Sequence, residues 1–188
     1  MPTRNWKNLI FIVFISRDIE YHLHALNWLA DNESYEPDAL VNLRPTTPLR
    51  DPNIIDNAIK LFLENPNFDS LRSVQISKEN PFKMWTIENK SLKQIALLEN
   101  IKEPYNEPRQ KLPLSYWQNG YIDIVKSSVL KNQESTTGEK ILPYIIDNPS
   151  IDLDYPEEIE KAENQLNEKI NKNKSLKNNS KINITRFP

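Results

Sequence analysis

Residues 39–62 read ALVNLRPTTPLRDPNIIDNAIKLF, and this segment decides the fold. Its first residues, Ala39 to Leu43, are largely apolar and end in a proline-rich turn, which is typical of an interior strand that opens into a loop. Asp51 followed by Pro52 predicts a helix N-cap and the first helical residue. Apolar residues then recur at helical spacing, at Ile55, Ala58, Ile59 and Phe62. The segment therefore predicts a strand, a loop and a helix that ends near Pro66.

Upstream of this segment the sequence predicts one more helix, from about Asp18 to Asn32. Its apolar stripe consists of Ile19, Leu23, Leu26 and Ala30. Residues 1–17 form an atypical amino-terminal segment with one apolar run, Leu9 to Ile15. That run is far shorter than the roughly 20 residues that span a bilayer, and no small-residue cleavage site follows it. We interpret it as a strand or as an extension foreign to the fold.

Downstream, strands alternate with helices. The additional predicted strands are Leu71 to Ile76, Gly120 to Val125 and Ile141 to Ile146. Such alternation predicts an α/β fold with a mainly parallel sheet and helices on its faces, and ligands in such folds bind at the carboxyl ends of the strands. Residues 77–118 are proline-rich and charged, which predicts a lobe that projects from the sheet.

The last predicted helix begins at Asp154, an N-cap with Glu157 three residues later. Its apolar residues at helical spacing are Ile159, Ala162, Leu166 and Ile170. From 171 to 188 the sequence is basic and rich in asparagine, which predicts a disordered basic tail. We therefore expect a main domain over residues 18–170, flanked by the atypical segment 1–17 and by this tail.

Composition excludes several classes of function. With 24 basic and 26 acidic residues among 188, the formal charge is −2, so we expect no electrostatically driven binding to nucleic acid or to a membrane. The chain has no cysteine, which excludes thiolate metal sites and cysteine nucleophiles and favours a cytoplasmic location. Its two glycines cannot build a glycine-rich phosphate loop or a serine nucleophile elbow.

Two carboxylates could carry metal chemistry. Asp152 and Asp154 are two residues apart, so in an extended segment both point to one face, with Ile151 and Leu153 on the other. Mg²⁺ is commonly held by one or two carboxylates together with substrate phosphates and water. The alternative is that Asp154 caps the following helix and Asp152 is a solvated neighbour.

Two clusters of polar and cationic residues could bind an anion. Arg44 to Arg50, RPTTPLR, combines rigid prolines, hydroxyl donors and two cations after the predicted strand. The local chemistry alone favours the alternative, a stiff turn whose arginines pair with surface acids. The second cluster precedes Gly120 and comprises Arg109, Lys111, Tyr116, Trp117, Gln118 and Asn119. Arginine binds carboxylates bidentately and amides bind hydroxyls. His22 and His24 do not share a helix face, and we interpret them as structural.

Five motifs occur in an order that resembles the acylneuraminate cytidylyltransferases. They are VNLRPTTPLR at 41–50, NPFK at 80–83, PRQKLP at 108–113, YWQNGYID at 116–123 and SIDLD at 150–154. The similarity covers residues from about 18 to 163, and enzymes that act on legionaminic or pseudaminic acid are similar. The resemblance implies a partial Rossmann-like nucleotidyltransferase sheet with flanking helices and a projecting dimerisation lobe.

The resemblance also implies an activity and its residues. The anomeric hydroxyl of a nine-carbon 2-keto sugar acid would attack the α-phosphate of CTP, giving the CMP-sugar and pyrophosphate. Asp152 and Asp154 match the positions that hold Mg²⁺. Lys83 and Arg109 match positions that face the sugar acid across a homodimer interface, with Asn119 beside them. Arg44 stands where several relatives carry glutamine.

The amino-terminal part departs from the family pattern. Relatives begin with a strand and a loop rich in Arg, Ser, Gly and Lys that binds the CTP phosphates, and residues 1–15 do not resemble it. We therefore expect an amino-terminally truncated cytidylyltransferase. The alternatives are a non-catalytic sugar-acid-binding or dimerising remnant that uses the lobe from Lys83 to Arg109, and a decayed gene product without function.

Overall fold

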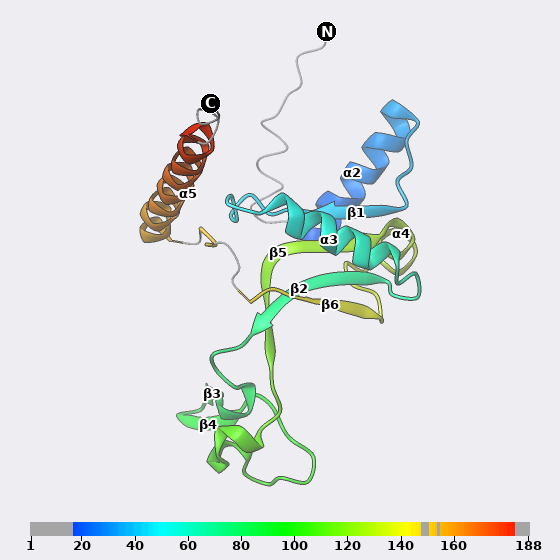
Figure 1. Ribbon diagram of the computed structural model, residues 1–188. Coiled ribbons are helices and arrows are strands. Elements are labelled where there is room, and N and C mark those ends of the chain that lie inside the picture. Colours follow the sequence, from blue (N-terminus) through cyan, green and yellow to red (C-terminus); the bar gives the residue numbers. More distant parts are fainter. Residues whose placement is uncertain (1–16, 148–150, 154, 183–188) are drawn as a thin grey trace.

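The computed structural model describes residues 17–147, 151–153 and 155–182, and it is built around a four-stranded sheet (Figure 1). The strand order is β1-β5-β2-β6. The strands are β1 (Ala39–Asn42), β5 (Tyr116–Lys126), β2 (Ser70–Ile76) and β6 (Ile141–Ile145). All four predicted strands are confirmed, although β5 begins before Gly120 and continues to the edge of the lobe.

The expectation of a mainly parallel sheet is wrong. β5 pairs antiparallel with β1 and with β2, and only β2 and β6 pair in parallel. Three strands still run in one direction, because β1 and β2 are both antiparallel to the strand between them. The lobe accounts for the difference, since the chain leaves the end of β2, forms the lobe and returns as β5 from that same end. The carboxyl ends of β1, β2 and β6 therefore share one edge of the sheet.

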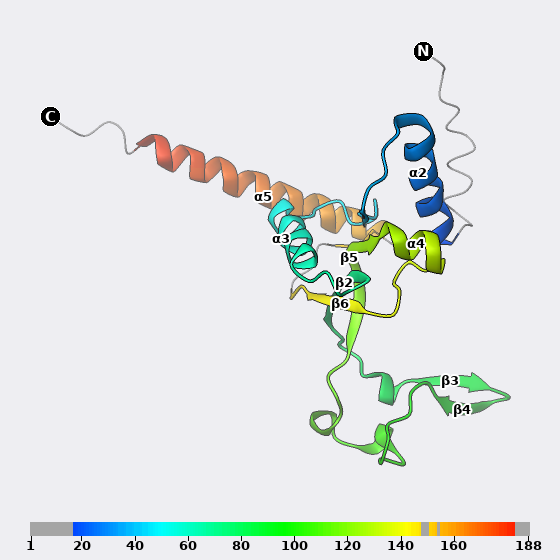
Figure 2. The same ribbon diagram turned by 90° about the vertical axis from the view of Figure 1, so that its right-hand side faces the viewer.

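Helices cover both faces of the sheet near β1. The helix α2 (Asp18–Glu33) and the short helix α4 (Ser127–Gln133), which the sequence did not predict, pack on one face. The buried cluster there consists of Leu26, Val125, Val129 and Leu130, with Leu40 of β1 packed against it. The helix α3 (Pro52–Leu63) covers the opposite face (Figure 2). Its cluster contains Ala58, Phe62, Leu71, Tyr121, Ile122, Ile124 and Ile146, with Ala39 of β1 packed against it.

The predicted start of α3 is confirmed. Asp51 has extended backbone angles, Pro52 is the first helical residue, and the Asp51 carboxylate accepts a hydrogen bond from the Asn53 N–H at 2.9 Å. A capping carboxylate satisfies one of the donors that the first turn leaves free. The cap thus fixes where the 44–50 loop ends and the helix begins.

The segment between β2 and β5 forms a lobe that projects from the sheet, as Figure 1 shows. It contains a hairpin, β3 (Trp85–Glu88) and β4 (Ser91–Gln94). It also has three short 3-10 helices: η1 (Pro81–Lys83), η2 (Pro104–Asn106) and η3 (Arg109–Lys111). The hairpin turn, Asn89-Lys90, has positive φ at both residues, as a two-residue primed turn requires. Sequence reasoning missed this hairpin, although the Asn at its turn was a usable signal.

The carboxyl-terminal helix α5 (Pro156–Ile182) differs from the prediction at both ends. It begins at Pro156, which makes Tyr155 the capping residue, and the Glu158 carboxylate accepts the Tyr155 N–H at 2.9 Å. The predicted cap, Asp154, lies outside the described residues. The helix continues through residues 171–182, where we predicted a disordered tail, because lysine and asparagine do not exclude helix. Within the described ranges no helix is both long and apolar enough to cross a bilayer.

Candidate functional site

The loop between β1 and α3, residues 44–50, is fixed by Arg50. Its guanidinium donates to the backbone carbonyls of Tyr121 at 2.6 Å, of Gly120 at 3.4 Å and of Thr47. The guanidinium carbon also lies 5.8 Å from the centre of the Tyr121 ring. Burial lowers the pKa of Arg50 below its ordinary value, while the charge of Asp152 acts in the opposite direction. Arg50 therefore ties the loop to β5 and uses three of its five N–H donors on backbone carbonyls.

Asp152 lies against this same loop. The Thr47 hydroxyl, in a residue that is only 1% exposed, donates to the Asp152 carboxylate at 3.4 Å. The backbone N–H of Leu153 donates to the Thr46 carbonyl at 2.7 Å. Two segments that are about a hundred residues apart in the sequence are thereby joined where β1 and β6 end. Asp152 thus lies against the loop that carries Arg44 and Arg50, whereas Asp154 lies outside the described residues.

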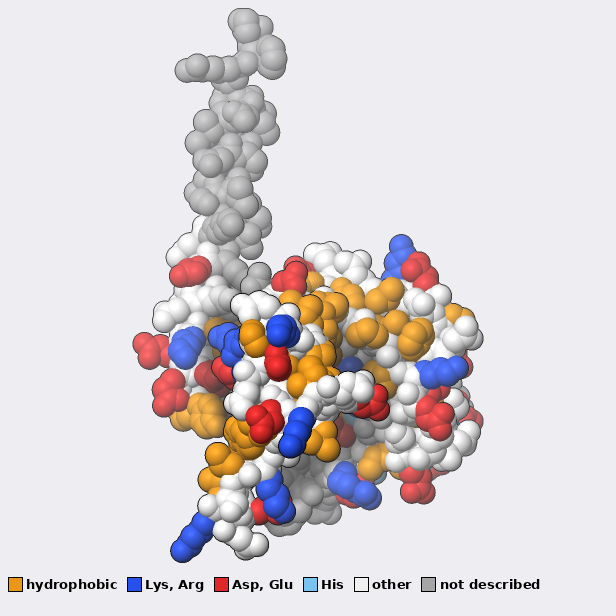
Figure 3. All heavy atoms as spheres, turned by 90° about the horizontal axis from the view of Figure 1, so that it is seen from below, with side chains coloured by type: hydrophobic (Ala, Val, Ile, Leu, Met, Phe, Trp, Pro, Cys, Tyr) orange, Lys and Arg blue, Asp and Glu red, His pale blue; other side chains and the backbone are white. Residues whose placement is uncertain are grey.

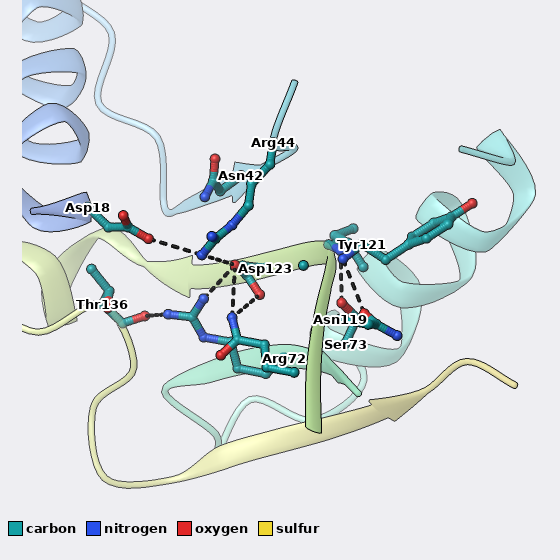
Figure 4. A network of polar contacts seen from close by, with 12 residues as sticks. Asp18, Asn42, Arg44, Arg72, Ser73, Asn119, Tyr121, Asp123 and Thr136 are labelled. Atoms are coloured by element: carbon teal, nitrogen blue, oxygen red, sulfur yellow. Dashed lines mark hydrogen bonds and ion pairs between the residues drawn. The ribbon is translucent and has the colours of Figure 1, made fainter. Parts of the chain in front are cut away.

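A buried carboxylate, Asp123, organises the polar network beside the loop (Figure 4). Its side chain is 5% exposed and forms ion pairs with Arg72 at 2.5 Å and with Arg44 at 3.6 Å. Gln118 donates to the same carboxylate at 3.3 Å. Arg44 also pairs with Asp18 of α2 at 3.2 Å. The network thus connects two strands, the 44–50 loop and one helix, and its two arginines balance its two carboxylates.

The side chain of Arg44 packs against the turn at Gly120, the residue that follows Asn119. Gly120 has a φ of +65°, and a Cβ there would lie 3.5 Å from the Arg44 Cδ. The buried Asn119 accepts the Tyr121 N–H at 3.2 Å through its side-chain oxygen. Its side-chain nitrogen has no hydrogen-bond partner among the described residues. Asn119 therefore keeps a buried side-chain donor that no other described residue satisfies.

Lys83 and Arg109 lie in the lobe, beyond the Tyr116 end of β5, and the fold does not bring them to the 44–50 loop of the same chain (Figure 1). Lys83 donates to the Tyr105 carbonyl at 2.8 Å. Arg109 donates to the Lys78 carbonyl at 3.0 Å and pairs with Glu79 at 3.2 Å. Both cations therefore have local partners within the lobe.

The carboxylate of Asp152 suits a hard cation that takes only one or two of its ligands from the protein. Mg²⁺ prefers oxygen ligands and is often held by one or two carboxylates, with phosphates and water completing its shell. Asp152 supplies one carboxylate, and the described residues contain no group of three or more His, Asp or Glu side chains that could enclose a metal. This arrangement suits an open site shared with a phosphate ligand and does not suit a closed protein cage.

His22 lies beside the network and makes stability depend on pH. It is 4% exposed, and neither ring nitrogen has a hydrogen-bond partner in the described part of the chain. Burial lowers its pKa below the ordinary 6.5. Below pH 6.5 the imidazole of His22 therefore takes up a proton in the unfolded chain but stays neutral in the folded chain. The free energy of unfolding consequently decreases as the pH falls from 6.5 to the lower pKa of the folded state.

We expect His22→Gln to flatten the pH dependence of the free energy of unfolding just below pH 6.5, whatever it does to stability at neutral pH. The exposed His24 provides a matched control, and His24→Gln should leave the slope as in the parent chain. Urea denaturation at several pH values measures both. Equal slopes for the His22 variant and the parent would show that His22 is not held neutral by burial.

The sheet order, the helices on its two faces and the loops at the carboxyl ends of the strands define an α/β protein with a nucleotidyltransferase-like fold. Among solved structures the chain matches CMP:2-keto-3-deoxy-manno-octonic acid synthetase complexed with CTP. The TM-score is 0.56 at 11% sequence identity, over 83% of this chain and 70% of that chain. No family model matches the sequence, and no curated protein matches it.

Sequence reasoning missed three residues that build this site: Asp123, Arg72 and Thr47. Asp123 and Arg72 sit within strands that read as apolar and half-buried, where a charged residue is unusual unless it is paired. Opposite charges on two predicted neighbouring strands were thus a usable signal. Nothing local to Thr47 shows that its hydroxyl is buried against Asp152, because the partner is supplied by a distant segment.

Proposed function

We propose that this chain is a cytidylyltransferase that transfers CMP from CTP to a 2-keto sugar acid and releases pyrophosphate. The single observation that carries the proposal is the junction of Asp152 with Thr47 in the 44–50 loop, at the edge where β1 and β6 end. Ligands of open α/β sheets bind at this edge. The fold match to a sugar-acid synthetase complexed with CTP supports the proposal, because that protein binds CTP on a similar architecture.

In the proposed reaction the anomeric hydroxyl oxygen attacks the α-phosphorus of CTP. The bond from this phosphorus to the bridging oxygen breaks, pyrophosphate leaves, and the hydroxyl proton passes to solvent. Asp152 and Asp154 would hold Mg²⁺, which when bound supplies positive charge to the triphosphate. The contribution of the chain itself is to hold the carboxylate of Asp152 in place through the Thr47 hydroxyl.

The acceptor that we propose is a nine-carbon 2-keto sugar acid such as an N-acylneuraminate or a legionaminate. The carboxylate shared by all 2-keto sugar acids suits arginine, which binds it bidentately. Arg44 is the exposed candidate at the sheet edge, since 40% of its side chain is accessible. Asn119 would offer its free amide donor to the sugar, whereas Arg50 would contribute charge from within the loop.

A homodimer would bring Lys83 and Arg109 to the sugar of the partner chain. The lobe that carries them has an apolar surface (Figure 3). Its exposed hydrophobic side chains include Ile87 at 77%, Leu92 at 61%, Leu97 at 81% and Leu114 at 73% exposure. Exposed apolar patches of this kind mark protein interfaces. This surface also favours the second candidate function, a non-catalytic dimerising or sugar-acid-binding protein.

Pyrophosphate release tests the proposal. We expect the purified chain, given CTP, Mg²⁺ and N-acetylneuraminate or 2-keto-3-deoxy-manno-octonate, to release pyrophosphate in proportion to the acid. The methyl ester of the same sugar is the matched control, and because it lacks the carboxylate charge it should give little or no product. Saturable binding of the acid without pyrophosphate would support the second candidate. Neither turnover nor binding of the acid would overturn both.

A further inference from the structure

The outer edge of β1 is open in the described part of the chain. β1 is the end strand of the sheet and pairs only with β5. The Ser127 N–H donates to the Asp38 carbonyl at 2.9 Å, and hydrogen-bonded pairs alternate along an antiparallel ladder. Leu40 and Asn42 therefore pair with β5, while the backbone groups of Ala39 and Val41 point outward. An edge of this kind is a template for another strand.

The faces of the sheet next to this edge are already covered. Leu40 packs into the cluster under α2, and Ala39 packs into the cluster under α3. A strand added beside β1 would lie between the flanks of these two helices and would be buried on both faces. Strands in that position are continuously apolar and do not alternate with polar residues. A strand that pairs with the open edge of β1 must therefore be continuously apolar.

Residues 9–15, LIFIVFI, are continuously apolar. The described part of the chain also begins close to the edge that such a strand would join. Asp18, the first residue of α2, contacts Arg44, which follows the carboxyl end of β1. The first described residue, Arg17, therefore lies next to that end of the sheet. A strand that finished there would run parallel to β1, with α2 as the crossover between them. Strand-helix-strand units of this form are right-handed and need only short connections.

We propose that residues 9–15 add to the open edge of β1 as a fifth, parallel strand. The proposal does not depend on the enzymatic function, because it rests on strand pairing and burial alone. At about 3.3 Å per residue, the seven residues are more than long enough to cover the four residues of β1. The added strand would pair the outward groups of Ala39 and Val41 and would place Ser16 and Arg17 beside the Arg44 loop.

The absence of native cysteine permits a direct test by crosslinking. Val41→Cys is combined in turn with a single cysteine at each residue from 10 to 14, and the pairs are oxidised or treated with a short bismaleimide. Neighbouring strands lie about 4.8 Å apart, within the Cα separation that a disulfide bridges. Because side chains alternate between faces, we expect intrachain crosslinks at every second position, at least about tenfold above the positions between them.

The matched control replaces Val41→Cys by Ile87→Cys, an exposed residue of the lobe hairpin, which should give only background crosslinking. Crosslinks without alternation, or equal to the control, would overturn the proposal, and so would crosslinks formed only between two chains. Hydrogen exchange is a second readout: the amides of Ala39 and Val41 should exchange at least about tenfold faster in Ile12→Asp than in the parent chain. Equal exchange rates would contradict the added strand.

Discussion

Replacing both Asp152 and Asp154 by asparagine is expected to abolish Mg²⁺-dependent binding of CTP and the release of pyrophosphate. The double change keeps size and hydrogen-bonding capacity but removes both charges that would hold the cation. Loss of partners outside the first coordination shell already costs about 10–100-fold in metal affinity, so loss of two ligands should exceed about 100-fold. Calorimetric titration of CTP with and without Mg²⁺ measures the effect.

Two controls separate the metal role from a structural one. Asp56→Asn removes an exposed carboxylate of α3 outside the site and should leave CTP binding unchanged. Thr47→Val removes the hydroxyl that donates to Asp152 while keeping the size of the side chain, and it should weaken binding less than the double change. Unaltered Mg²⁺-dependent binding in the double variant would rule out a metal role for both carboxylates and would leave Asp152 a structural one, through its hydrogen bond with Thr47.

Asp123→Ala is expected to destabilise the fold by roughly 3–5 kcal/mol, the usual consequence of removing one partner of a buried ion pair. Asp123 is 5% exposed and Arg72 is 11% exposed, so the change leaves a guanidinium charge without its partner inside the protein. The Gln118 amide loses its acceptor as well. Urea denaturation, read as the change in the free energy of unfolding, measures the loss.

Asp18→Ala is the matched control because it removes the other carboxylate of the same network. Asp18 is 42% exposed, so water screens its pair with Arg44, and the expected loss is at most about 1 kcal/mol. Replacing Asp123 and Arg72 together by leucine should recover part of the stability lost in Asp123→Ala, since no unpaired buried charge remains. Equal losses for Asp18→Ala and Asp123→Ala would show that burial does not set the strength of this network.

Much of the fold could be predicted from the sequence, because the signals are local. Ile19, Leu23 and Leu26 repeat at helical spacing, and all three pack in or against the cluster under α2. Asp51-Pro52 fixes the start of α3 through contacts within two residues. The expectation of a mainly parallel sheet failed because direction depends on how the chain returns to the sheet. The lobe between β2 and β5 controls that return, and composition does not encode it.

The candidate site was predicted in part. The sequence indicated Arg44 and Arg50 as candidates for binding an anion and Asp152 as a candidate metal ligand. The structure places all three in or against the 44–50 loop. It did not predict that Arg50 would be bound to backbone carbonyls, or that Arg44 would be held between two carboxylates. These partners come from β5 and α2, and their positions depend on packing.

The sequence by itself determined the four strands of the main sheet and the helices α2 and α3, where α3 is capped, and which acidic and basic side chains are available for chemistry. Periodicity and capping are interactions among residues a few positions apart, so they are readable without a fold. Only the tertiary structure decided that Asp123 is buried between Arg72 and Arg44, and that Asp152 meets Thr47. These contacts join segments dozens of residues apart, and the packing of helices on a mixed sheet sets which of them meet.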